Sequence, residues 1–255
     1  KFKSSPRYEE PMGSTNWPSW PRLVQGCTQL RTPHGGLAIS GYSIFNEIGS
    51  NFVHGAEPVN RFWYTSSNMD AKDLVKILEN GLASDFRYKE AIQQVISPNC
   101  KGEVWLVGGM LYKSILNGLY GTSFTTQDLD FLAHKSDKFI LPDGWIGQST
   151  RHGEPKLEKN GTRVDIMWLE NMHSILEHGA EYKVESYLSG VPLTIQSIAY
   201  DINRKTLLGE AGINAILSRT VGIMNQDEYN YCLETYRDHY SVERFSKELT
   251  LKIEI

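Results

Sequence analysis

Apolar and polar positions follow a regular pattern only in the later part of the chain. Residues 1–35 contain five prolines and no apolar period that could build a helix or a strand. Residues 36–66 are rich in glycine, serine and aromatic residues and also lack a period. Helical spacing first appears over 70–81, and a second helical pattern runs over 84–98. We therefore expect an irregular arm followed by a helical region within residues 1–100.

Strand patterns begin after this helical region. Val104–Val107 is a short apolar run that ends at Gly108 and Gly109, and helical spacing resumes after the glycines. Asp128–Leu132 is a second apolar run, and Lys156–Leu169 contains an Asn-Gly pair that favours a hairpin turn. Since strands alternate with helices, the sequence predicts an α/β (α+β) fold.

The last third of the chain gives weaker patterns. The sequence predicts a strand over Lys183–Leu188, short helices over 194–200 and 212–218, and one long polar-aromatic helix over 226–249. Tyrosines at helical spacing in this last helix could stack on bases, although such residues more often pack against a neighbouring sheet.

Composition narrows the class of protein. The chain has 255 residues, of which 40% are apolar and 22% charged, as is usual for a soluble globular protein. Apolar runs are too short for a membrane helix, and we expect no membrane partner and no signal peptide. A net charge of −4 argues against a basic nucleic-acid wrapper. Three distant cysteines without a CxxC pair favour a reducing, cytoplasmic location.

Three aspartates are the candidate catalytic and metal-binding residues. Asp128 and Asp130 are two positions apart on a predicted strand, so both carboxylates point to the same face. Asp165 lies in an apolar strand of the predicted hairpin, where a lone charge is costly. If that strand lies beside the first, three carboxylates converge on a site suited to Mg²⁺ or Mn²⁺.

Gly108 and Gly109 are the candidate phosphate-binding residues. They join a strand to a helix without side chains, so backbone N–H groups at the helix start can face an anion. Neither the glycine pair nor Asp-x-Asp is specific alone, and their order along the chain is more informative. The alternative is a packing turn at the glycines, a turn-capping Asp128 and an Asp165 paired with a base such as Arg163.

The same order of motifs resembles a known family. A strand ending in Gly108-Gly109, a helix and the strand Asp128–Phe131 are similar to the nucleotidyltransferase fold of the polymerase-beta superfamily. Within it, the head domain of tRNA CCA-adding enzymes and bacterial poly(A) polymerases is the most similar. Later segments that share the likeness are Leu193–Asp201, Gly212–Gly222, Arg244-Phe245 and Lys252–Glu254. The resemblance implies a mixed sheet flanked by helices, a head domain over 101–224 and a neck-like helix over 225–255.

The resemblance also implies an activity. A nucleoside monophosphate would pass from a nucleoside triphosphate to a hydroxyl, with release of pyrophosphate. Asp128 and Asp130 would hold two metal ions, Asp165 the one that activates the hydroxyl, and the two glycines the triphosphate. An RNA 3′ end is the favoured acceptor, with protein or small-molecule acceptors left open.

Two further residues are candidates for nucleotide binding. Lys113 could reach a phosphate from the first turn of its helix, and Gln196 could touch a ribose, although both could equally be ordinary surface residues. Tyr112 and Lys113 stand where the family usually has Arg-Asp. Because of such departures, two alternatives stay open: a toxin-type or defence-type nucleotidyltransferase that modifies tRNA or protein, and a catalytically silent binding module.

Overall fold

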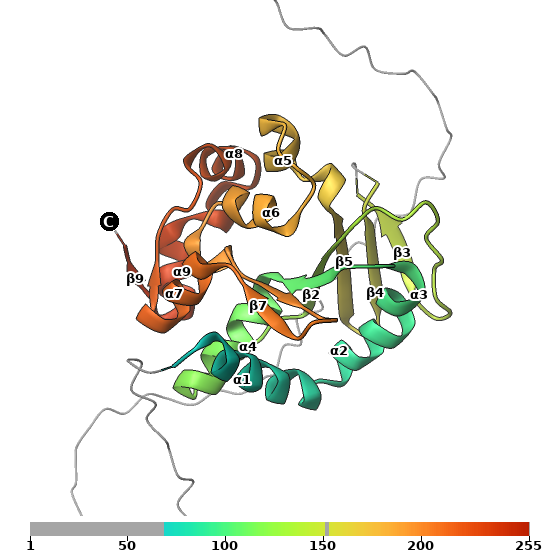
Figure 1. The fold of residues 1–255 in the computed structure, drawn as a ribbon, viewed down its shortest axis with the longest axis horizontal. Helices are drawn as coiled ribbons and strands as arrows, with labels where there is room; N and C mark the ends of the chain where they lie inside the picture. Colours follow the sequence, from blue (N-terminus) through green and yellow to red (C-terminus); the bar gives the residue numbers. More distant parts are fainter. Residues whose placement is uncertain (1–68, 151–152, 255) are drawn as a thin grey trace, which may run out of the picture. The chain divides into compact units, whose positions relative to one another are not determined.

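A computed structural model describes residues 69–150 and 153–254 of the chain (Figure 1). The irregular arm expected before residue 69 lies outside these residues. Among the helices of the described part, none has the length and apolar character needed to span a membrane.

The described residues form a seven-stranded mixed sheet in the order β3-β4-β5-β2-β1-β6-β7. Neighbouring strands are antiparallel except β2 and β5, which are parallel. The predicted α/β fold with a mixed sheet flanked by helices is therefore confirmed. A second, parallel pair joins β8 to β9. The strands are β1 (Val104–Val107), β2 (Asp128–Ala133), β3 (Ile146–Ser149), β4 (Pro155–Lys159), β5 (Thr162–Trp168), β6 (Ala199–Asp201), β7 (Thr206–Leu208), β8 (Thr220–Val221) and β9 (Lys252–Ile253).

Helices pack on both sides of the main sheet, as Figure 1 shows. They are α1 (Ala71–Ser84), α2 (Phe86–Glu90), the π-helix η2 (Ala91–Ile96), α3 (Ser97–Asn99), α4 (Gly108–Tyr120), α5 (His173–His178), α6 (Val184–Gly190), α7 (Glu210–Ser218), α8 (Gln226–Tyr236) and α9 (Val242–Leu249). Short 3₁₀ turns are η3 (Leu169–Asn171), η4 (Thr194–Gln196) and η5 (Arg237–Tyr240).

Alternate residues of β1 serve two separate hydrophobic clusters. Leu106 belongs to the larger one, together with buried residues of α1 and α4. Trp105 and Val107 point to the opposite face and belong to a smaller cluster that includes residues of α5 and α6. A central strand with both faces buried explains why this segment is apolar at every position.

The Asn-Gly hairpin is confirmed. Asn160 and Gly161 have φ values of 50° and 78°, and they connect β4 to β5 with Lys159 opposite Thr162. Both positions need the left-handed region of φ/ψ space, which asparagine and glycine tolerate best. This tight turn sets the register along the whole hairpin.

Three predictions about the last third of the chain were wrong. Lys183–Leu188 is not a strand, because Val184–Gly190 forms α6 with Val184 and Leu188 buried one helical turn apart. The segment 194–200 is helical only in η4, after which Ala199–Asp201 pairs with β1 as β6. The single helix expected over 226–249 is interrupted, because Arg237 has a positive φ of 55° and a new helix starts after the Ser241 cap.

Candidate active site

The structure brings the three predicted aspartates together on neighbouring strands. Asp130 of β2 lies directly opposite Asp165 of β5 in the parallel register, and Asp128 is two residues away on β2. The residues between them, such as Leu129 and Val164, are fully buried on the other face. Strand alternation therefore directs all three carboxylates to one face of the sheet.

Asp130 has the most unusual environment of the three carboxylates. Burial, followed by the negative charges of Asp165 and Asp128, raises its pKa to about 7. The positive charge of Lys156 and a backbone hydrogen bond from Gly109 oppose this rise. Since the ionised form of Asp130 is disfavoured, a further positive charge beside it would stabilise that ionised form.

Basic residues already pair with the other two carboxylates. The Lys156 ammonium forms an ion pair with Asp165 Oδ2. Arg163 lies 3.7 Å from Asp128 Oδ1 and 3.8 Å from Glu158 Oε2, and its side chain is half exposed. The alternative expected Asp165 to pair with a base such as Arg163, and the partner in the structure is Lys156.

The donor set suits a hard divalent cation. Oxygen ligands from three carboxylates are what Mg²⁺ and Mn²⁺ prefer, and the pKa of Asp130 is raised mainly by burial and then by the charges of the other two carboxylates. Within the described part of the chain, no three His, Cys, Asp or Glu side chains are arranged around one point as metal ligands are. Asp128, Asp130 and Asp165 fit such an ion in chemistry and register, and the side chains would have to turn to enclose it.

The glycine turn directly adjoins Asp130. Gly108 has a φ of 69°, and a Cβ atom there would lie 2.2 Å from Asp130 Oδ2. Val107, the residue before α4, supplies no side-chain cap, and the Gly109 N–H in the first turn of the helix interacts with the Asp130 carboxylate. At Gly109 a Cβ would meet Thr126 Oγ1 at 3.4 Å, which is ordinary contact. Gly108 is therefore needed for the close approach of the turn to the carboxylate.

Lys113 and Gln196 are placed differently. Lys113 is not a solvated surface residue, because its Nζ donates to Glu248 Oε1 at 2.7 Å and to the Thr125 carbonyl at 3.2 Å. Gln196 lies in η4, and its Oε1 is buried without a hydrogen-bond partner. Gly108 and Gly109 thus adjoin the aspartate site, whereas Lys113 is bonded to Glu248 of α9.

Three buried tyrosines that were not predicted as site residues are affected by the charge of Asp130. Tyr112 of α4, Tyr187 of α6 and Tyr240 of η5 each have a raised pKa, caused mainly by burial and also by the charge of Asp130. The pKa of Tyr240 rises to about 12. Tyr112 carried a signal in the sequence as a departure from the Arg-Asp pair, and Tyr240 carried one as a tyrosine of the polar-aromatic helix that could stack on bases. Tyr187 could not be found because its helix was expected to be a strand.

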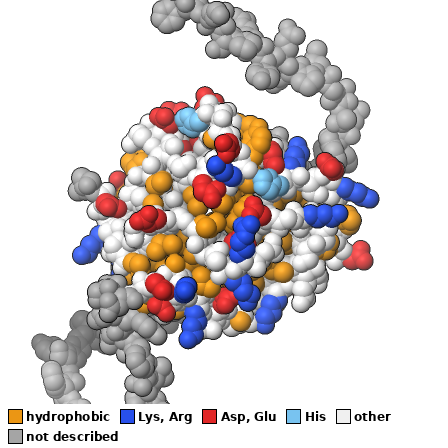
Figure 2. All heavy atoms as spheres, viewed as in Figure 1, with side chains coloured by type: hydrophobic (Ala, Val, Ile, Leu, Met, Phe, Trp, Pro, Cys, Tyr) orange, Lys and Arg blue, Asp and Glu red, His pale blue; other side chains and the backbone are white. Residues whose placement is uncertain are grey.

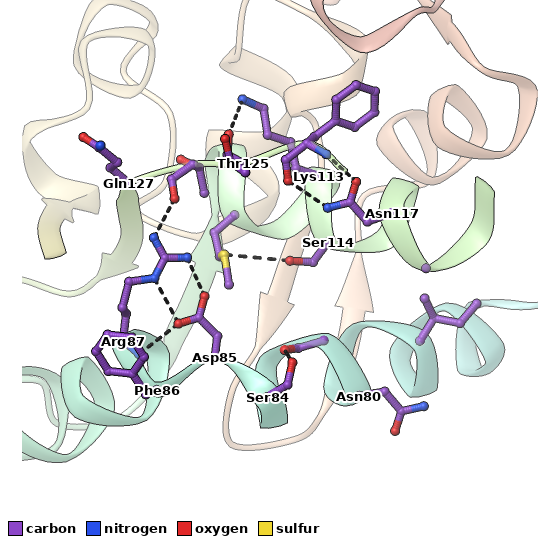
Figure 3. A pocket seen from close by; sticks show the side chains of 16 residues that line it. Asn80, Ser84, Asp85, Phe86, Arg87, Lys113, Ser114, Asn117, Thr125 and Gln127 are labelled. Atoms are coloured by element: carbon purple, nitrogen blue, oxygen red, sulfur yellow. Dashed lines mark hydrogen bonds and ion pairs between the residues drawn. The ribbon is translucent and has the colours of Figure 1, made fainter. Parts of the chain in front are cut away.

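A groove of about 920 Å³ lies beside the start of β2 (Figure 3). It is lined by residues of α1, α2, α4 and the segment 124–127. Arg87 pairs with Asp85 and donates to the Thr126 carbonyl at 2.7 Å, while Asn117 holds the backbone of Phe124. These bonds fix the segment that leads into Asp128.

Acidic and basic side chains are interspersed over the surface in view in Figure 2. This face carries no continuous basic area. The mixture agrees with the small net charge of the chain.

Neither a known protein family nor a curated protein matches the sequence. Solved structures do match this fold. The similarity is to CCA-adding enzymes. One is the Bacillus stearothermophilus CCA-adding enzyme in complex with CTP, with a TM-score of 0.46, 18% identity and coverage of 69% of this chain and 40% of that chain. Another is the Thermotoga maritima CCA-adding enzyme complexed with tRNA, with a TM-score of 0.42, 18% identity and coverage of 73% and 43%.

A third match is a tRNA nucleotidyltransferase complexed with a primer tRNA and an incoming ATP analogue. Its TM-score is 0.43, with 13% identity and coverage of 60% of this chain and 43% of that chain. In all three, the matched part is less than half of the solved chain.

The raised pKa of Asp130 leads to a prediction about stability. The ordinary pKa of an Asp carboxyl is 3.8, against about 7 in the fold. Between these pH values the unfolded chain releases the proton and the folded chain keeps it, so stability falls as pH rises and stays low above pH 7. We expect Asp130→Asn to raise the melting temperature by several degrees above pH 7 and to change it little near pH 4, in thermal scans with EDTA.

Asp128→Asn is the matched control for this prediction. Asp128 lies on the same strand, but its side chain is 51% exposed and accompanied by Arg163. We expect a smaller stabilisation from this variant than from Asp130→Asn, because it removes only one minor cause of the raised pKa of Asp130 and also loses the pairing with Arg163. An Asp130→Asn protein no more stable than the parent at pH 8 would contradict the argument.

Proposed function

We propose that this chain is a metal-dependent nucleotidyltransferase that transfers a nucleoside monophosphate from a nucleoside triphosphate to a hydroxyl. The observation that carries the proposal is the parallel register of Asp130 and Asp165, with Asp128 beside them and the glycine turn against Asp130. A carboxylate cluster and the backbone N–H groups of a helix start are two elements that phosphoryl transfer uses.

Each part of the site has a role in this reaction. Asp128, Asp130 and Asp165 would hold the metal ion or ions, Mg²⁺ or Mn²⁺. When bound, the metal would neutralise phosphate charge and lower the pKa of the acceptor hydroxyl. Gly108 and Gly109 carry no side chains of their own and would let the triphosphate approach the first N–H groups of α4 once Asp130 turns toward the metal.

The reaction balances as a substitution at phosphorus. The hydroxyl oxygen of the acceptor forms a bond to the α-phosphorus, and the bond from that phosphorus to the bridging oxygen of the β-phosphate breaks. Pyrophosphate leaves, and the hydroxyl proton passes to solvent or to a nearby carboxylate. An RNA 3′ end is the acceptor that we propose.

The test is transfer of label from α-labelled nucleoside triphosphates. The purified chain is incubated with Mn²⁺ or Mg²⁺, each of the four nucleotides, and total RNA, protein or no added acceptor. We expect labelled RNA and release of pyrophosphate in the same reaction. Label in protein would favour the alternative of a toxin-type or defence-type enzyme.

A catalytically silent module is the remaining alternative. The ion pairs of Lys156 with Asp165 and of Arg163 with Asp128 favour it, because they offset carboxylate charge without a metal. Calorimetry separates the two: a silent module binds neither metal nor nucleotide, whereas an enzyme binds nucleotide when metal is present. Absence of both transfer and binding would overturn the proposed function.

A further inference from the structure

Lys156 lies at the centre of the carboxylate site although it has no assigned role there. It is on β4, directly opposite Asp165 of β5 in the hairpin register. Its side chain shares the open face of the sheet with the aspartates, because the alternate residue Leu157 is buried on the other face. The ammonium contacts Asp165 Oδ2, and the two side chains are 44% and 24% exposed.

The charge of Lys156 acts on all three carboxylates. Burial lowers its pKa, but the bond to Asp165 and the charges of Asp130 and Asp128 more than compensate, and the pKa is raised overall. Lys156 in turn lowers the pKa of Asp130. One ammonium group thus offers part of the positive charge that a divalent cation would bring to the same oxygens.

The start of α4, where a phosphate would bind, is also occupied by a group of this chain. The Gly109 N–H favours the charged form of the Asp130 carboxylate and lowers its pKa. Asp130 Oδ2 also occupies the space that a side chain at position 108 would need. Each half of the site is therefore held by a group of this chain with the charge of the expected ligand: an ammonium for the metal and a carboxylate for the phosphate.

We propose that Lys156 is the resident counter-ion of the three aspartates, which a divalent cation must displace from Asp165 and which then binds a phosphate oxygen of the nucleotide. The inference rests on the proposed function and deepens it. Displacement is a competition between two cations for one carboxylate. Lys156 therefore weakens the binding of metal in the absence of nucleotide. A bound nucleotide favours metal binding, because its phosphate gives the released ammonium a new partner.

The space next to Lys156 suits this second role. A cavity of about 450 Å³ opens beside it, lined by the carboxylates of Asp128, Glu158 and Asp165, by Lys156 and Arg163, and by Ile146, Gln148 and Leu157. Arg163 gives this cavity a second positive charge, which Asp128 at 3.7 Å and Glu158 at 3.8 Å offset as long as no metal is bound. A phosphate oxygen in the cavity would replace the carboxylate as the partner of the ammonium.

The test measures Mn²⁺ binding by electron paramagnetic resonance, without nucleotide. Lys156→Met and Lys156→Gln remove the charge while keeping similar length, and either variant can serve if the other does not fold. We expect both to bind Mn²⁺ about tenfold more tightly than the parent, since a charge-assisted bond no longer competes for Asp165. Lys156→Arg keeps the charge and should bind Mn²⁺ no more tightly than the parent.

Lys76→Met is the matched control, because Lys76 is an exposed lysine of α1. It should leave Mn²⁺ affinity and nucleotide transfer unchanged. In the transfer assay, Lys156→Met should raise KM for the nucleoside triphosphate about tenfold, a change that Lys156→Arg partly rescues. Opposite shifts of metal affinity and nucleotide KM would not arise from a merely structural role.

The outcomes distinguish this inference from the proposed function. If the parent binds Mn²⁺ and the neutral variants bind it equally or more weakly, the role of Lys156 is wrong and the proposed function stands. Tighter Mn²⁺ binding with an unchanged KM would overturn the phosphate contact. If the parent binds no Mn²⁺ with or without nucleotide, both proposals fail.

Discussion

Replacing Asp165 with asparagine is expected to reduce nucleotide transfer by about 10³-fold or more. The substitution keeps the shape of the side chain and removes one of the three negative charges on the open face of the sheet. Metal ions contribute several kcal/mol to the stabilisation of transition states in phosphoryl transfer, and each 1.36 kcal/mol corresponds to a factor of about ten in rate. The measurement is the initial rate of label transfer at saturating nucleotide and metal.

Asp137→Asn is the control for the Asp165 variant. Asp137 is an exposed aspartate in the segment after β2, outside the carboxylate site and the cavity beside Lys156. It should leave the rate of transfer near that of the parent. An Asp165→Asn protein that labels its acceptor as fast as the parent would remove Asp165 from the catalytic site.

Gly108→Ala is expected to abolish transfer and to destabilise the fold. The new methyl group would lie 2.2 Å from Asp130 Oδ2 and 2.9 Å from its Cγ, and φ is 69°. The left-handed conformation alone costs about 1–2 kcal/mol for a residue with a Cβ, and displacement of Asp130 adds to that cost. Denaturant unfolding and the transfer assay measure the two effects separately.

Gly121→Ala separates strain from contact. Gly121 ends the same helix with a φ of 63°, and a Cβ there meets no atom within 4 Å. The Gly121→Ala protein should be less stable by the cost of the backbone strain and should keep its activity. Equal loss of activity in both variants would contradict the specific role of Gly108.

The identity of the candidate residues followed from local pattern, whereas their partners did not. Asp128 and Asp130 are two apart on one strand, so their common face could be predicted. Asp165 stood out as a lone charge in an apolar strand, where its burial would be costly. The sequence did not show that β5 lies beside β2. The structure shows that the two strands pair in parallel.

Lys156 was accessible to sequence reasoning but was not identified. The Asn-Gly turn places Lys159 opposite Thr162, and counting back along the hairpin puts Lys156 opposite Asp165. Tyr187 was not accessible in this way. The short segment around it fits a strand and a helix equally well, and its helical form depends on burial of Val184 and Leu188 in the smaller cluster.

Local order along this chain was thus encoded in its residues: the periods of β1, β2 and α4, the hairpin turn, and the spacing of two carboxylates. These features depend on backbone conformations within a few residues, which side-chain type largely determines. Convergence of Asp130 with Asp165, the ion pair at Lys156 and the contact of Asp130 with the glycine turn emerged only on folding. They join segments from different parts of the chain, and burial and packing choose such neighbours rather than any local period.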